Sequence, residues 1–178
     1  YFCCDSVAQP CRKYGVEIER YHIDVDFRPM FPKVLETDEW LYIVNFYGQI
    51  NNDEVKAWKK QFGRVILDNA QAYFQKPVDG VDTIYTCRKF FGVADGAFMY
   101  TQDRPEGLER DESFNRMRFV LGRFERTAGE FYKESADNNE FFTNEPVKLM
   151  SKLTDNFLRG IDYSAVEKRR TENFSYLH

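Results

Sequence analysis

Three residues able to bind or react with a ligand lie at or just after apolar runs of the sequence. Asn45 and Asp68 each end such a run, and Lys89 closely follows a third. If these runs are neighbouring parallel strands, their carboxyl ends share the edge of the sheet at which open α/β sheets bind ligands. Asp68 and Lys89 would then face one crevice. They could act on a ligand there, they could form an ordinary salt bridge, or Asp68 could cap a helix; the spacing leaves these alternatives open.

The elements that must position these residues alternate along the first hundred residues. Continuous apolar runs such as 40–45 are typical of strands buried on both faces of a parallel sheet, and residues 52–62 carry apolar side chains at helical spacing. The repeated strand–helix–strand order predicts an α/β fold: a three-layer α/β/α sandwich with a mainly parallel sheet and right-handed crossovers. We expect strands at 1–4, 16–24, 40–45, 64–68, 81–86 and 97–100, and helices at 6–14 and 52–62.

The sequence changes character after Thr101. Residues 103–112 are charged and contain Gly and Pro, as expected of a loop. We therefore expect an α/β core at 1–101 and a helical segment at 102–178. Because the chain opens as if inside a strand and ends in a helical pattern with no stop signal, we also expect it to be a piece of a longer protein. Helical periodicity predicts the helices at 113–133, 146–158 and 163–178.

Composition excludes several classes of function. With 43% hydrophobic residues and a net charge of -4, the 178-residue chain can bury a core, and a broad nucleic-acid surface is not expected. No apolar run is long enough for a membrane helix, and no signal peptide is visible. Cys3, Cys4 and Cys11 lack a fourth metal ligand, so we expect buried thiols rather than a metal site. A reducing cytoplasm suits these free cysteines better than a disulfide scaffold does.

Two stretches that contain the strand-end residues resemble pyridoxal-phosphate (PLP) enzymes of fold type I, in particular the DegT-type sugar aminotransferases. Residues 65–72 read Val-Ile-Leu-Asp-Asn-Ala-Gln-Ala, and residues 82–97 read Asp-Thr-Ile-Tyr-Thr-Cys-Arg-Lys-Phe-Phe-Gly-Val-Ala-Asp-Gly-Ala. In that family an apolar strand ends in Asp-x-Ala-Gln, and a later strand is followed by a hydroxyl residue and the Schiff-base lysine. Residues 1–24 and 44–48 are similar to upstream parts of the same family.

The resemblance implies a role for each of five residues. Lys89 would be the Schiff-base lysine and would carry a proton during the reaction, while Asp68 would keep the pyridine nitrogen protonated. Gln71 would lie against the cofactor ring, Thr86 would offer its hydroxyl to the phosphate, and Asn45 would direct its amide to the ring edge. The implied reaction moves an amino group from a small-molecule donor to a keto-sugar nucleotide or related carbonyl compound.

The resemblance also implies a larger assembly than this chain. It implies a homodimer and an edge strand at 97–100 that is antiparallel to its neighbour. The phosphate loop and the small domain of the family are not in this sequence, so we expect residues 1–178 alone to bind PLP poorly. The alternative function is a non-catalytic structural or interaction module that keeps the scaffold without a cofactor. A generic nucleotide-binding domain has no P-loop or glycine fingerprint here to support it.

Overall fold

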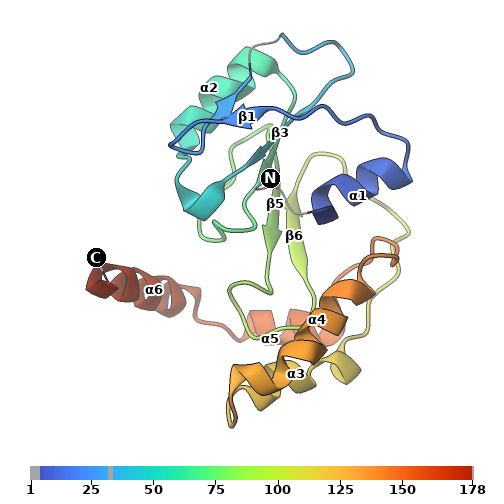
Figure 1. The fold of residues 1–178 in the computed structure, drawn as a ribbon, viewed down its shortest axis with the longest axis vertical. Helices are drawn as coiled ribbons and strands as arrows, with labels where there is room; N and C mark the ends of the chain where they lie inside the picture. Colours follow the sequence, from blue (N-terminus) through green and yellow to red (C-terminus); the bar gives the residue numbers. More distant parts are fainter. Residues whose placement is uncertain (1–4, 32–33, 178) are drawn as a thin grey trace.

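A four-stranded sheet forms the centre of the computed structural model, which describes residues 5–31 and 34–177 (Figure 1). Its strand order is β3-β4-β5-β6. The first three strands are parallel and β6 is antiparallel to β5, which confirms the mostly parallel sheet with an antiparallel edge strand. The fold is therefore mixed α/β. The strands are β3 (Leu41–Val44), β4 (Val65–Asp68), β5 (Asp82–Thr86) and β6 (Ala97–Tyr100).

One face of this sheet packs on helix α2 (Asn52–Phe62). The helix begins at a capping box, in which the Asn51 side chain accepts the N–H of Glu54 and the Glu54 side chain accepts the N–H of Asn51, and it ends at Gly63, whose φ of 76° is in the left-handed region. Val55 of α2 is fully buried against the sheet. The core cluster consists of Leu41, Ile43, Ile50, Val55, Val65, Leu67, Val78 and Val81. The members of this cluster that lie in β3 and β4 alternate along these strands with half-buried side chains on the opposite face.

The N-terminal part departs from the predicted strand at 16–24. Helix α1 (Asp5–Lys13) confirms the first predicted helix, but the only strand in this segment is β1 (His22–Ile23). It pairs with β2 (Pro29–Met30) in a separate antiparallel sheet, because the Asp24 side chain accepts the N–H groups of Asp26 and Arg28 and turns the chain back on itself. The predicted strand at 1–4 lies outside the described residues.

The predicted helix at 113–133 is wrong as a single element. The segment is divided among 3-10 helix η2 (Phe114–Arg116), α3 (Arg118–Gly122) and 3-10 helix η3 (Ala128–Phe131), and α4 (Tyr132–Phe141) follows. The chain reverses after Gly122 because Phe131 packs directly onto that glycine, where any Cβ would overlap its ring. Apolar residues from the two sides of the reversal pack together, while others of the segment are exposed: Met117, Phe119, Val120 and Phe131 share one cluster, and Leu121, Phe124 and Tyr132 face solvent.

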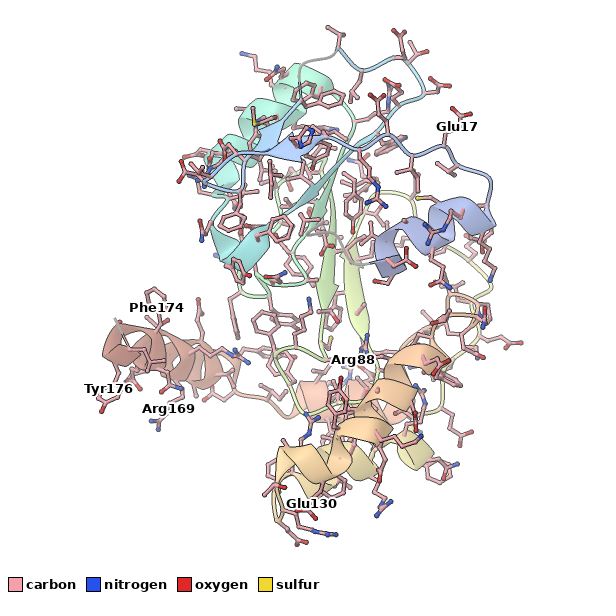
Figure 2. All side chains as sticks on the ribbon, in the orientation of Figure 1. Glu17, Arg88, Glu130, Arg169, Phe174 and Tyr176 are labelled. Carbon is pink, nitrogen blue, oxygen red and sulfur yellow. The ribbon has the colours of Figure 1, made fainter. Side chains whose placement is uncertain are left out.

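The last two helices follow the predicted positions more closely. Helix α5 (Lys152–Arg159) starts later than residue 146 because Ser151 is its N-cap and accepts the N–H of Thr154. Helix α6 (Tyr163–Leu177) has no buried residue and projects away from the body of the molecule, with Phe174 and Tyr176 near its tip (Figures 1 and 2). Among the described residues, no helix is long and apolar enough to cross a membrane.

A buried carboxylate ties α5 to the loop before β6. Asp95 is only 2% exposed and accepts three hydrogen bonds, from the backbone N–H of Ser151 at 2.6 Å, from the Ser151 hydroxyl at 3.0 Å and from the Thr154 hydroxyl. Its negative charge sits at the N-terminus of α5, where the helix dipole favours an anion. Through this contact the helical segment is fastened to the sheet. The proposed division of the chain at 101–102 stays a prediction.

Candidate functional site

The carboxyl ends of the three parallel strands lie side by side. In the register of the sheet, Val44 pairs with Asp68 and Asp68 pairs with Ile84. Beyond these pairs the Asn45 N–H donates to the Asp68 carbonyl at 3.0 Å, and the Asn69 N–H donates to the Ile84 carbonyl at 2.8 Å. The strand ends that the sequence indicated therefore share one edge of the sheet.

Asp68 ends β4 with its carboxylate held by two uncharged donors. The Tyr42 hydroxyl donates to Oδ2 at 2.8 Å, and the backbone N–H of Ala70 donates to Oδ1 at 2.8 Å. The residue is 8% exposed. No lysine or arginine forms a salt bridge with it within 5–31 and 34–177, so the salt-bridge alternative for this aspartate has no support there. Since a carboxylate accepts up to about four hydrogen bonds, Asp68 can accept a further donor.

Thr86 lies on the same face of the sheet as Asp68. Successive side chains of a strand point to opposite faces, and Asp68 pairs with Ile84, so Thr86, two residues on, shares their face. Tyr42 and Ile66 belong to this face as well. Thr86 is half-buried. This face thus brings together a carboxylate and a hydroxyl at the end of adjacent strands.

Lys89 lies in the turn that follows β5. The Cys87 carbonyl accepts the N–H groups of Phe90 and Phe91, at 3.0 and 2.9 Å, and these bonds shape the turn. Lys89 is exposed, and it forms no hydrogen bond or ion pair with the residues that the structure describes. Asp68 and Lys89 are therefore not bonded to each other, and the approach of the two side chains to one ligand stays a prediction.

Arg88 anchors this turn to helix α4. Although the residue as a whole is exposed, its guanidinium lies 5.0 Å from the centre of the Phe142 ring and donates to the Asn139 side chain. Burial, and then the like charge of Arg116, lowers the pKa of Arg88. In Figure 2 the labelled Arg88 lies between the strands and the helices below them. Its side chain thus fixes one end of the segment that carries Lys89.

Asn45 does not join Asp68. Its side chain is fully buried on the opposite face, where Nδ2 contacts the Asn69 and Gln75 side-chain oxygens at 3.0 and 2.6 Å, and Oδ1 accepts the Ile50 N–H at 3.0 Å. The amide is thus fully buried and hydrogen-bonded inside the protein, on the face opposite Asp68. Asn45 therefore organises the loop beyond β3 rather than an exposed site.

Gln71 remains at the edge but already has one partner. Its Oε1 accepts the backbone N–H of Tyr47 at 3.2 Å, which connects the turn after β4 to the loop after β3. Sequence reasoning missed both Tyr47 and Tyr42. Alternation along the strand could have placed Tyr42, because it lies two residues before Val44 and so shares its face. It was not considered as a polar residue because it lies within an apolar run.

A cavity of about 290 Å³ lies elsewhere, between α3 and α4. Its charges are already neutralised, because Arg118 pairs with Glu134, Asp137 with Lys133, and Arg116 with Asp111. It contains none of the predicted site residues. Its walls are Asn115, Arg116, Arg118, Phe119, Glu134, Asp137, Asn138 and Phe141.

Neither metal chemistry nor similarity to known proteins adds a second candidate. Within the part of the chain that the structure describes, no cluster of His, Cys, Asp and Glu could hold a metal ion. No family model matches the chain, and comparison with curated proteins and with solved structures found no match. The candidate site is therefore defined by its own residues: Asp68, Thr86 and Lys89, with Gln71 at its border.

Proposed function

We propose that this chain is the cofactor-binding core of a PLP-dependent aminotransferase that transfers an amino group to a keto-sugar nucleotide or a related carbonyl compound. One observation carries the proposal. An aspartate with spare acceptor capacity ends one parallel strand, and a lysine without an ion pair among the described residues lies in the turn after the next strand. The antiparallel β6 that follows agrees with the expected order of elements. A three-layer sandwich of the PLP-transferase type is part of this proposal.

The residues at the sheet edge fit the chemical demands of PLP. A pyridinium N–H needs an anionic acceptor, and Asp68 offers one whose two present donors are neutral. A phosphate needs hydroxyl or N–H donors, and Thr86 has a hydroxyl on the same face of the sheet. Asn45 does not fit the role of a cofactor ligand, because its amide is hydrogen-bonded to other residues inside the protein. The proposed set is therefore smaller than the set suggested by sequence.

Each residue of the set has a defined task. Bound PLP supplies an electron sink that makes the α-proton of an amino acid acidic. Asp68 holds the proton on the ring nitrogen, which an amide in its place could not do. Lys89 binds the cofactor through Nζ and then moves the proton at the substrate α-carbon. The Tyr42 hydroxyl orients the Asp68 carboxylate by donating to Oδ2.

The proposal extends to assembly and compartment. A homodimer would complete the site, with a small-molecule amino donor and a carbonyl acceptor as substrates. The cytoplasm is the proposed compartment, and the free thiols of Cys11 and Cys87 agree with a reducing environment.

The experiment is a titration of the chain with PLP, followed by the absorbance of the bound cofactor. Because residues 1–178 alone are expected to bind PLP poorly, the titration extends to millimolar PLP, where we expect a weak but saturable spectral change that Lys89→Ala abolishes and Asp68→Asn weakens about tenfold. Lys76→Ala is the matched control, because Lys76 is also an exposed lysine, on the connection between β4 and β5, and it should leave the titration unchanged. A spectral change of equal size in Lys89→Ala, or none in the parent chain, would overturn the proposal and favour the non-catalytic module.

A further inference from the structure

Two aromatic residues have a backbone conformation that normally belongs to glycine. Phe27 has a φ of 62° and Tyr47 a φ of 56°, and among the described residues they are the only non-glycine residues with positive φ. Their rings contact each other, with centroids 5.7 Å apart, and Phe27 also packs on Phe46 at 5.6 Å. Large side chains are disfavoured in the left-handed region because Cβ crowds the following carbonyl. Both residues with this unfavourable backbone conformation are in contact, so their positive φ angles need a physical explanation.

Packing of the fold does not supply that reason for Tyr47. Its side chain is 70% exposed, so little burial offsets the strained backbone. Gly48, the next residue, has a φ of 72°. If the turn needed only a left-handed residue at position 47, Gly or Asn would meet the need with less strain. The tyrosine therefore points to a function of the side chain itself.

The strained pair lies at the ligand-binding edge of the sheet. The N–H of Tyr47 donates to Gln71 Oε1 at 3.2 Å, and an added Cβ on Gly48 would lie 3.5 Å from the Ala72 side chain. Both contacts are with the turn that begins at Asp68. The backbone at Tyr47 and Gly48 thus contacts the turn that follows the proposed catalytic aspartate, beyond the carboxyl ends of β3 and β4.

A hydrogen-bonded turn carries Phe27, whose ring meets the Tyr47 ring edge-on. The Phe27 N–H donates to the Asp24 carbonyl at 3.1 Å, and the Asp24 side chain accepts the Arg28 N–H at 2.8 Å. Arg28 in turn forms an ion pair with Glu54 of helix α2 at 2.9 Å. The hydrogen bond from Arg28 to Glu54 raises the pKa of the guanidinium, which stays charged at any physiological pH. These bonds order the turn that carries Phe27, and the Phe27 ring in turn contacts the Tyr47 ring.

We propose that Tyr47, supported by Phe27, is the platform on which the nucleobase of the sugar-nucleotide substrate stacks. Exposed aromatic rings bind nucleobases of any sequence through their π faces. A ring fixed in advance loses little conformational freedom on binding. The inference rests on the proposed function, because that function supplies a nucleotide-bearing substrate. It adds to that function a residue that holds the end of the substrate remote from the reacting carbon.

The experiment measures nucleotide binding without PLP, so its outcome is separate from that of the cofactor titration. The probes are uridine 5′-monophosphate and adenosine 5′-monophosphate, and ribose 5-phosphate is the matched probe without a base. Binding is followed by NMR titration of the chain. We expect both nucleotides to bind more tightly than ribose 5-phosphate, and saturation transfer to reach their base protons.

Variants at position 47 separate stacking from a structural role. Tyr47→Phe keeps the ring and should keep the affinity within about twofold, whereas Tyr47→Asn should weaken nucleotide binding by about 5- to 100-fold. Because Asn tolerates positive φ, Tyr47→Asn should also leave the melting temperature unchanged or raise it. Tyr14→Asn is the control, since Tyr14 is 69% exposed but unstrained, and it should leave the affinity unchanged. Equal binding of ribose 5-phosphate, or full nucleotide affinity in Tyr47→Asn, would overturn the inference.

Discussion

Removal of the Asp95 carboxylate tests how the helical segment is fastened to the sheet. Asp95→Ala deletes the acceptor of three hydrogen bonds in a site that is 2% exposed. A hydrogen bond to a charged group contributes about 1.5–3 kcal/mol, and loss of the carboxylate leaves buried donors unsatisfied. Because the Ser151 and Ser113 hydroxyls can still bond each other, part of the loss is recovered. We expect the free energy of unfolding to fall by about 4 kcal/mol.

The assay is thermal and guanidinium unfolding followed by circular dichroism. For a domain of this size the expected loss corresponds to a fall in melting temperature of about 8–16 °C. Asp95→Asn keeps one oxygen and the shape of the side chain, so it should lose about half as much. Asp137→Ala is the control, because among the described residues this surface carboxylate pairs only with Lys133, and its loss should change stability by less than about 0.5 kcal/mol. Similar melting temperatures for Asp95→Ala and the control would show that Asp95 does not fasten the helical segment to the sheet.

Three further predictions concern the interior. Asn45→Ala should lower the free energy of unfolding by about 2–4 kcal/mol in denaturant titrations, because its buried partners lose their hydrogen bonds; an unchanged midpoint would show that they re-pair. Gly122→Ala should cost about 1–3 kcal/mol by calorimetry, since the new methyl group collides with Phe131; a neutral effect would mean that the ring moves freely. Burial raises the pKa of Cys87 to about 12, so the reactive thiolate forms only as pH rises towards that value. Iodoacetamide at neutral pH should modify Cys11 and spare Cys87 in the folded chain. Mass spectrometry of the peptides measures both modifications, and equal modification of the two thiols would contradict the prediction.

The parallel strands could be predicted because their signal is local. β3 and β4 are nearly continuous apolar runs, and β5 alternates buried with half-buried residues; the register of the sheet then aligns the strand ends. The segment at 16–24 has alternating apolar residues too, but a strand needs a partner, and the turn at Asp24 supplies one only to His22 and Ile23. Pairing is a non-local property, so periodicity alone overestimated this strand.

The prediction of one helix at 113–133 was wrong for a related reason, namely that packing between segments is also a non-local property. Its apolar residues recur at helical spacing, but the cluster they form joins residues from both sides of the reversal between Gly122 and Phe131. A stripe on one helix and a contact between two short ones produce the same sequence pattern. The space that Phe131 occupies over Gly122 exists only in the folded chain.

The positions of the candidate site residues along the strands could be predicted from the sequence, but the contacts of their side chains could not. Apolar runs located Asp68 and the end of β5, which bounds the Lys89 turn, without knowledge of the fold. The face on which each side chain lies depends on register: Val44 pairs with Asp68, so Asn45 points to the opposite side. The donation from Tyr42 to Asp68 depends on the same register. The left-handed backbone at Tyr47 has no local signal beyond the following glycine.

The most direct test of the central claim is borohydride reduction of the chain in the presence of PLP, followed by peptide mapping. Exposed lysines also react with the aldehyde, so a parallel sample contains excess pyridoxine 5′-phosphate, which occupies a PLP site but has no aldehyde. We predict a pyridoxyl label on Lys89 that this competitor suppresses and that Asp68→Asn diminishes, while labels on other lysines are insensitive to both. Labelling of Lys89 no stronger than that of Lys76, and unaffected by the competitor, would contradict the assignment of a PLP site to this sheet edge.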